Sequence, residues 1–191
     1  MGRHPFFSLR HGLPLMAVAV LAGSGPIACG VAGPAPDRHG DAAGSTVKTP
    51  PPDNETHLLL RLGERRLYLI DGNPGTPVES FPIAIGKEGF ETPPGRYQVE
   101  EMVEHPDFFK VAWNEVPVRV IGWIPPGPTN PLGERWIGFA HGEGGTFGIH
   151  GTPNPELLGR AVSHGCIRMR NADVVRVYER VHLGTPVVVE P

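Results

Sequence analysis

Length, composition and charge exclude several classes of protein. The chain has 191 residues, which suits one domain with a tail. It carries 17 Lys and Arg against 20 Asp and Glu, a net charge of −3, which argues against a nucleic-acid-binding protein and against a polybasic membrane-surface protein. Two cysteines exclude a disulfide-dense scaffold, and 26 glycines with 23 prolines predict many turns.

Residues 1–29 have the layout of a secretory signal peptide. A basic start is followed by an apolar run from Leu13 to Ala22, too short to span a bilayer, and then by small residues. Cys29 follows Pro-Ile-Ala, which resembles a bacterial lipobox except that Pro26 stands where Leu is usual. We expect export to the periplasm or cell envelope. Cys29 is either lipidated, lost with the leader, or left without a role in the tail, and the sequence leaves this open.

Residues 30–55 read as a disordered linker, because they are rich in Gly, Ala and Pro, lack aromatic residues and end in three prolines. Residues 56–191 form the predicted folded domain. Short β-rich runs separated by turn residues predict a mainly β fold there, a sandwich or barrel. The expected strands are His57–Leu60, Arg66–Ile70, Val78–Ile85, Gly95–Val99, Trp136–Phe139, Thr146–His150 and Pro186–Val189.

One helix is predicted near the C-terminus. Asn171 suits its N-cap, and Val174, Val177, Tyr178 and Val181 share one face at helical spacing. Gly184 is a suitable stop signal after the last of these residues.

The residues with the clearest chemistry lie between positions 141 and 170. Cys166 is the only cysteine of the predicted domain, and His150 precedes it by sixteen residues. A thiol has a pKa near ~8.5, so an imidazole that takes its proton makes it an effective nucleophile. Gly165 leaves room for a substrate carbonyl and for oxyanion-stabilising N–H groups. The carbonyl of Gly151 is placed to hold the histidine ring.

Arg168 follows the cysteine by two residues and supplies a positive charge, either to lower the thiol pKa or to pair with a substrate carboxylate. Two other readings remain. Cys166 is a buried core thiol, or it forms a zinc site with His141, His150 and His164. The order of histidine before cysteine excludes a papain-like enzyme.

These motifs resemble the L,D-transpeptidase catalytic domain, the YkuD family. The resemblance rests on His150-Gly151-Thr152-Pro153 followed by Ser163-His164-Gly165-Cys166-Ile167-Arg168-Met169. Further agreement comes from Glu91-Thr92-Pro93-Pro94-Gly95-Arg96-Tyr97, Asn130-Pro131-Leu132-Gly133 and Gly184-Thr185-Pro186-Val187. The similarity covers roughly residues 56–190.

The resemblance implies a β-sandwich with one or two short helices near Cys166. It also implies peptidoglycan synthesis, and so a role in cell-wall biogenesis and cell shape. Cys166 would take the acyl group of a tetrapeptide stem as a thioester and pass it to an amine, giving a 3–3 cross-link or an attached protein. His150 would be the base, and Gly165, His164, Arg168 and Gly151 would shape the site.

No metal or organic cofactor is expected, and the expected partners are peptidoglycan stem peptides, not nucleic acid. A membrane contact is expected only through the signal peptide or a lipid anchor, and the oligomeric state is not predicted. Two alternatives stay open. One is hydrolysis of the same bonds by an L,D-carboxypeptidase or endopeptidase, and the other is a catalytically silent wall-binding module.

Overall fold

The computed structural model describes residues 55–72, 79–112, 119–142 and 145–191. Within these ranges the chain is mostly strand, with one α-helix, α1 (Asn171–Tyr178), and one 3-10 turn, η1 (Pro155–Leu157). This confirms the predicted mainly β class with one or two short helices. The predicted signal peptide and nearly all of the predicted linker lie outside the described residues. No helix in the described part of the chain is long and apolar enough to cross a bilayer.

The first sheet has the strand order β3-β2-β1-β13-β5. β1 and β2 pair antiparallel as a hairpin, whereas β1 and β13 pair parallel. Alternate residues of β1 and β2 are buried, as expected for strands with one face on the core. The strands are β1 (His57–Arg61), β2 (Arg66–Ile70), β3 (Glu79–Pro82), β5 (Gly95–Gln98) and β13 (Pro186–Glu190).

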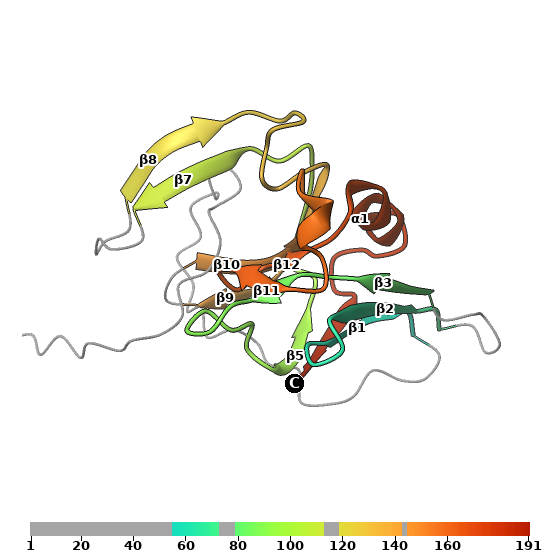
Figure 1. Cartoon of the computed structure of the whole chain (residues 1–191). Coiled ribbons are helices and arrows are strands. Elements are labelled where there is room, and N and C mark those ends of the chain that lie inside the picture. The colour runs from blue at the N-terminus through green and yellow to red at the C-terminus, as the bar shows by residue number, and fades with distance from the viewer. Residues whose placement is uncertain (1–54, 73–78, 113–118, 143–144) are drawn as a thin grey trace, which may run out of the picture.

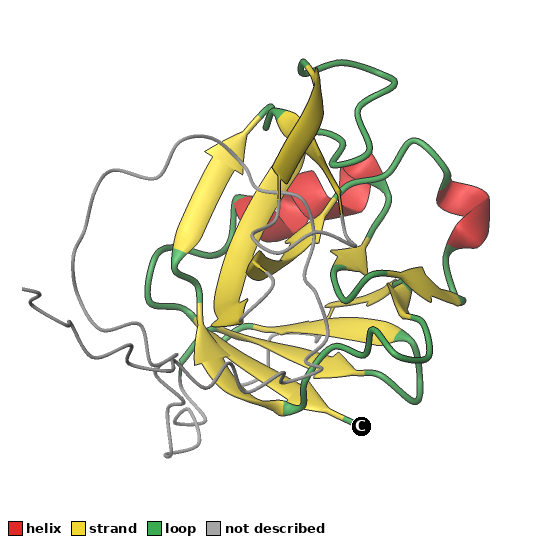
Figure 2. Cartoon of the chain, turned by 90° about the vertical axis from the view of Figure 1, so that its left-hand side faces the viewer, coloured by secondary structure: helices red, strands yellow, loops and turns green. Residues whose placement is uncertain are grey.

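The second sheet has the order β12-β10-β9-β6 and packs face to face with the first (Figures 1 and 2). Its strands are β6 (Glu101–Glu104), β9 (Arg135–Gly142), β10 (Gly145–His150) and β12 (Ile167–Arg168). Both sheets contribute to a single apolar cluster, to which α1 adds Val174 and Val177. This arrangement is the predicted sandwich.

Two further strand pairs were not predicted. β4 (Ile85–Gly86) pairs parallel with β11 (Ala161–Ser163), and β7 (Phe108–Ala112) pairs antiparallel with β8 (Arg119–Ile124). The β7–β8 hairpin stands away from the sandwich in Figure 1. On β8 the side chains of Val120, Ile121 and Trp123 are more than half exposed. Strands of this kind lack the alternation between core and solvent on which a sequence prediction depends.

Two predicted elements have different bounds in the structure. The expected strand Val78–Ile85 is divided into β3 and β4, and Val78 itself lies outside the described residues. Between the two strands the backbone changes partners, since the Ile83 N–H donates to the Arg65 carbonyl and Ala84 bridges to Arg168.

The predicted helix is shorter than its apolar pattern, and its cap was wrong. Arg170 occupies the N-cap position, and the helix ends at Tyr178, before Val181. The Asn171 side chain does not cap the helix. Its Oδ1 accepts a hydrogen bond from the Glu134 N–H at 3.1 Å. The side chain predicted to cap the helix locally therefore makes a contact with a distant segment instead.

Candidate active site

Cys166 lies in a turn between β11 and β12 that is held by two buried hydroxyl groups. The Ser163 Oγ donates to the Cys166 carbonyl at 2.6 Å and accepts the Gly165 N–H at 3.1 Å. From a distant segment, the Thr92 Oγ1 donates to the Gly165 carbonyl at 2.6 Å. Gly165 has φ +111°, and a β-carbon there would lie 2.7 Å from the Phe147 ring. A glycine is therefore required at this position.

The bend at Gly165 affects where the His164 side chain lies. In an extended segment the side chains of residues two apart share one face, but the positive φ of Gly165 interrupts the extended backbone. The His164 ring instead contacts Phe90 edge-on at 4.7 Å, and the Lys87 ammonium lies 4.9 Å from the centre of the Phe90 ring. His164 thus lies beside Phe90, whose ring also contacts Lys87.

His150 is the last residue of β10 and is held as the sequence predicted. Its Nδ1 lies 2.6 Å from the Gly151 carbonyl oxygen, to which the Nδ1–H donates, so that Nε2 remains as the basic nitrogen. Burial, with a smaller contribution from the positive charge of Arg168, lowers the His150 pKa to about 4, against the opposing effect of the Gly151 hydrogen bond. At neutral pH the ring is consequently uncharged and able to accept a proton.

The side chain of Trp136 contacts both candidate catalytic residues, His150 and Cys166. Its indole stacks on the His150 ring with centroids 6.0 Å apart, and it packs with Cys166 and Leu132 in one small apolar cluster. The Nε1–H donates to Glu101 at 2.7 Å, which fixes the ring. His150 and Cys166 therefore both contact the same buried side chain. The sequence analysis treated Trp136 only as the start of a strand.

The pairing of β10 with β12 determines which way their side chains point. The register matches Ile149 with Ile167 and His150 with Arg168 in a parallel pair. Both isoleucines are in the core between the sheets, so the pleat directs His150 and Arg168 to the opposite face. Arg168 therefore lies on the same side of its sheet as the histidine.

Cys166 is buried, and its Sγ lies 3.9 Å from the Thr146 carbonyl oxygen. It is disulfide-bonded in this structure, so the chemistry considered below is that of the reduced thiol. No hydrogen bond joins Sγ to the His150 ring in the described part of the chain. Catalytic hydrogen bonds are often formed only when substrate is bound.

The four candidate zinc ligands do not come together. His141 is turned toward Glu100, whose carboxylate lies 3.1 Å from Nε2, and toward the Thr146 hydroxyl at 3.0 Å. Among the described residues no three His, Cys, Asp or Glu side chains form a group that would hold a metal ion. The described residues therefore give the zinc interpretation no ligand set.

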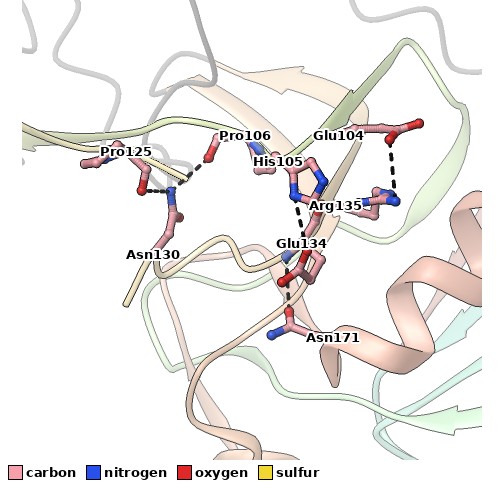
Figure 3. Close-up of polar contacts among 8 residues, drawn as sticks. All are labelled: Glu104, His105, Pro106, Pro125, Asn130, Glu134, Arg135 and Asn171. Carbon is pink, nitrogen blue, oxygen red and sulfur yellow. Dashed lines mark hydrogen bonds and ion pairs between the residues drawn. The ribbon is translucent and has the colours of Figure 1, made fainter. Parts of the chain in front are cut away.

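Gly151 has a second role that the sequence did not indicate. A β-carbon at Gly151 or Gly133 would lie within about 2 Å of the Asn171 Oδ1, so the loop before β9 packs directly on the residue after His150. In Figure 3 the same loop is fastened by Asn130, whose Nδ2 donates to the carbonyls of Pro106 at 2.8 Å and Pro125 at 3.1 Å. The backbone that orients His150 is thereby tied to the loop that carries Asn130.

Replacement of Thr92 by valine is expected to loosen the cysteine turn. Valine keeps the shape of threonine but leaves the buried Gly165 carbonyl without its partner, which costs about 1–3 kcal/mol of unfolding free energy. Thr92→Ser retains the hydroxyl and is the matched control. Urea unfolding of the reduced proteins measures the effect. Equal stability of Thr92→Val and wild type would show that the hydroxyl does not hold the turn.

The buried His150 makes stability depend on pH. Its pKa is about 4 when folded and 6.5 as the reference value, so between these values the unfolded chain binds a proton that the folded chain does not. Stability is fully retained above pH 6.5 and falls as the pH is lowered toward 4, by about 3 kcal/mol in total. The difference in unfolding free energy between wild type and His150→Gln, followed from pH 7 to 4, isolates this contribution. A difference that is constant with pH would contradict it.

Comparison with known proteins agrees with this fold. The profile of the L,D-transpeptidase catalytic domain, YkuD, matches residues 55–189. YkuD of Bacillus subtilis, named as an L,D-transpeptidase, is 30% identical over 154 residues, which is 78% of this chain and 77% of that protein. YqjB of the same organism, with the same designation, is 40% identical over 111 residues, 57% of each chain.

Solved structures show the same fold. An L,D-transpeptidase from Mycobacterium smegmatis superposes with a TM-score of 0.54 at 17% identity, over 72% of this chain and 59% of that one. L,D-transpeptidase 3 from Mycobacterium tuberculosis gives 0.53 at 20% identity, over 71% and 61%. At this level of identity the superpositions carry information on the fold alone.

The fold and the site together define a β-sandwich with a buried cysteine and histidine at the edge of its second sheet. The chain belongs to the L,D-transpeptidase catalytic-domain family, YkuD. The matched region covers 57% of the length of YqjB and 77% of the length of YkuD.

Proposed function

We propose that the protein is a peptidoglycan L,D-transpeptidase that acts through a thioester on Cys166. The observation that carries the proposal is that His150 and Cys166 both contact the same buried side chain, Trp136. With Nδ1–H committed to the Gly151 carbonyl, the uncharged ring offers Nε2 as the base. A matching family profile over the same residues supports the assignment.

The donor is a tetrapeptide stem whose last bond joins the L-centre of a diamino acid to D-Ala. The reduced Cys166 thiol gives its proton to the His150 Nε2, and the sulfur attacks the carbonyl carbon. The carbon–nitrogen bond then breaks, the amine takes the proton from His150, and D-Ala leaves. The amine of an acceptor attacks the thioester, which forms the new amide and returns the proton to sulfur through His150. The product is a 3–3 cross-link, or an attached protein.

The developing oxyanion needs N–H donors, and the turn limits which are used. The Gly165 N–H already donates to the Ser163 Oγ. We therefore assign the oxyanion contact to the Cys166 N–H, which the Ser163–carbonyl bond orients.

Incubation of the reduced protein with purified disaccharide-tetrapeptides, with products read by mass, tests the proposed function. A cross-linked dimer with released D-Ala is the expected result. A tripeptide alone would identify an L,D-carboxypeptidase, because water would then be the acceptor. Cleavage of a preformed 3–3 dimer would identify an endopeptidase. No change in any substrate would point to a wall-binding module.

Export and anchoring are part of the same proposal, since the substrate lies outside the cytoplasmic membrane. Residues 1–29 would direct secretion, and lipidation of Cys29 would leave Cys166 as the only thiol of the mature chain. Thiol titration of the denatured, reduced protein from an envelope fraction is expected to give one thiol per chain. If wild type needs detergent for its extraction from the envelope fraction and Cys29→Ala does not, the lipid anchor is on Cys29. Two thiols on a full-length cytoplasmic protein would contradict export.

A further inference from the structure

The Arg168 guanidinium forms no ion pair with any other described residue. Its Nε is buried and makes no hydrogen bond, and no ion pair or hydrogen bond to its guanidinium occurs within the described ranges. Burial lowers the pKa of this guanidinium. Cations that are partly buried are normally paired, because removing them from water is costly. An unmatched arginine beside a reactive cysteine is therefore expected to meet its partner in a ligand.

The surroundings of Arg168 favour an anion. Burial lowers the pKa of His164, and the positive charges of Lys87 and Arg168 act in the same direction. The Lys87 ammonium lies 4.9 Å from the centre of the Phe90 ring, which the His164 ring contacts. The nearest acidic residues in the chain segment of Lys87 are Glu88 and Glu91, and the Glu91 carboxylate accepts the N–H of Gly89. In the described residues neither carboxylate pairs with Lys87 or Arg168.

The backbone holds Arg168 independently of its side chain. The Arg168 N–H donates to the Ala84 carbonyl at 2.9 Å, and the Arg168 carbonyl accepts the Ala84 N–H at 3.0 Å. β12 is also paired with β10 on its other side. Because these bonds are made by main-chain groups, substitutions of the side chain leave the strand in place. The guanidinium is therefore not needed as a structural link.

Distances along the chain indicate which part of a substrate Arg168 reaches. In an extended strand, its Cα lies roughly 6–7 Å beyond that of Cys166, at ~3.3 Å per residue. The carboxylate of a leaving group one residue long lies within about 3.6 Å of the attacked carbonyl carbon. An arginine side chain spans the remaining gap, and its planar fork matches a carboxylate with two parallel hydrogen bonds.

We propose that Arg168 binds the terminal carboxylate of the donor stem and so restricts the enzyme to donors that end one residue after the scissile bond. The inference rests on the proposed function and adds a selectivity to it: the enzyme would require a free C-terminus on its donor. The other carboxylate near the scissile bond is the one on the side chain of the diamino acid, and the test separates the two.

The test compares three synthetic donors: the tetrapeptide, the same peptide with a C-terminal carboxamide, and the same peptide with only the diamino-acid carboxylate amidated. Acylation of reduced wild type, Arg168→Gln and Arg168→Lys is followed by intact mass. For wild type, the C-terminal carboxamide is expected to lower kcat/KM about 10- to 100-fold. Arg168→Gln should show the same loss with the free tetrapeptide and no further loss with the carboxamide. Arg168→Lys should recover part of the rate.

A stability control separates this proposal from its alternatives. Thermal unfolding should be the same in wild type and Arg168→Gln, since the proposed role is in donor binding and main-chain bonds hold the strand. The proposal would be overturned if Arg168→Gln lowered kcat/KM by the same factor on all three donors. It would also be overturned if amidation of the diamino-acid carboxylate, and not of the C-terminus, abolished the difference between wild type and Arg168→Gln. A wild-type protein that is not acylated by any donor would instead contradict the proposed function.

Discussion

Replacement of Cys166 by serine is expected to abolish formation of the acyl-enzyme. A hydroxyl has a far higher pKa than a thiol, and a single imidazole activates it poorly without the further groups of a serine-enzyme site. The side chains are nearly the same size, so the buried turn accommodates serine with little change in packing. Carbapenem is a reactive mimic of the donor bond, and intact mass after its addition measures acylation of the reduced protein.

The unfolding midpoint of Cys166→Ser, compared with reduced wild type, is the control for this experiment. The variant is expected to fold, because the contacts that hold the turn come from Ser163 and Thr92 and not from the thiol. A folded Cys166→Ser protein that still gains the mass of the carbapenem at the wild-type rate would remove the nucleophile assignment.

The second large effect is expected at His150. A general base commonly contributes ~10²–10⁴-fold, and His150→Ala should slow acylation by at least that factor. The reason is the orientation of the ring, whose Nδ1–H is used by Gly151 and whose face is covered by Trp136, so that Nε2 alone is available.

His164→Ala and His141→Ala are the matched comparisons, since both remove an imidazole from the same part of the chain. His164 contacts Phe90, and His141 pairs with Glu100, so neither has the arrangement of His150. Both variants should retain a measurable acylation rate. An active His150→Ala beside an inactive His164→Ala would reverse the two roles.

Local sequence patterns predicted those parts of the fold that depend on local periodicity. The strands β1 and β2 alternate buried and partly exposed residues, and the valines of α1 lie at helical spacing, so both were predicted. The β7–β8 hairpin was missed because the apolar side chains Val120, Ile121 and Trp123 of β8 are largely exposed and do not alternate between core and solvent. The N-cap of α1 was misassigned because Asn171 serves a tertiary contact with Glu134.

The same distinction applies to the site. Cys166, His150 and the role of the Gly151 carbonyl were visible in a short stretch of sequence with an unusual density of glycine and histidine. Trp136 and the hydroxyl of Thr92 were not, because their contacts with the site join segments far apart in the chain. No local pattern marks a threonine whose hydroxyl is used seventy-three residues away. The unmatched charge of Arg168 also requires knowledge of what surrounds it.

The most direct test of the account is to trap the acyl-enzyme with the natural donor. The reduced protein is mixed with the disaccharide-tetrapeptide without an acceptor, quenched in acid and analysed by intact mass and by peptide mapping. The account predicts a mass gain equal to the donor less D-Ala, carried by the peptide that contains Cys166 and removed by hydroxylamine. Release of D-Ala with no adduct in wild type, and at the same rate in Cys166→Ser, would contradict it.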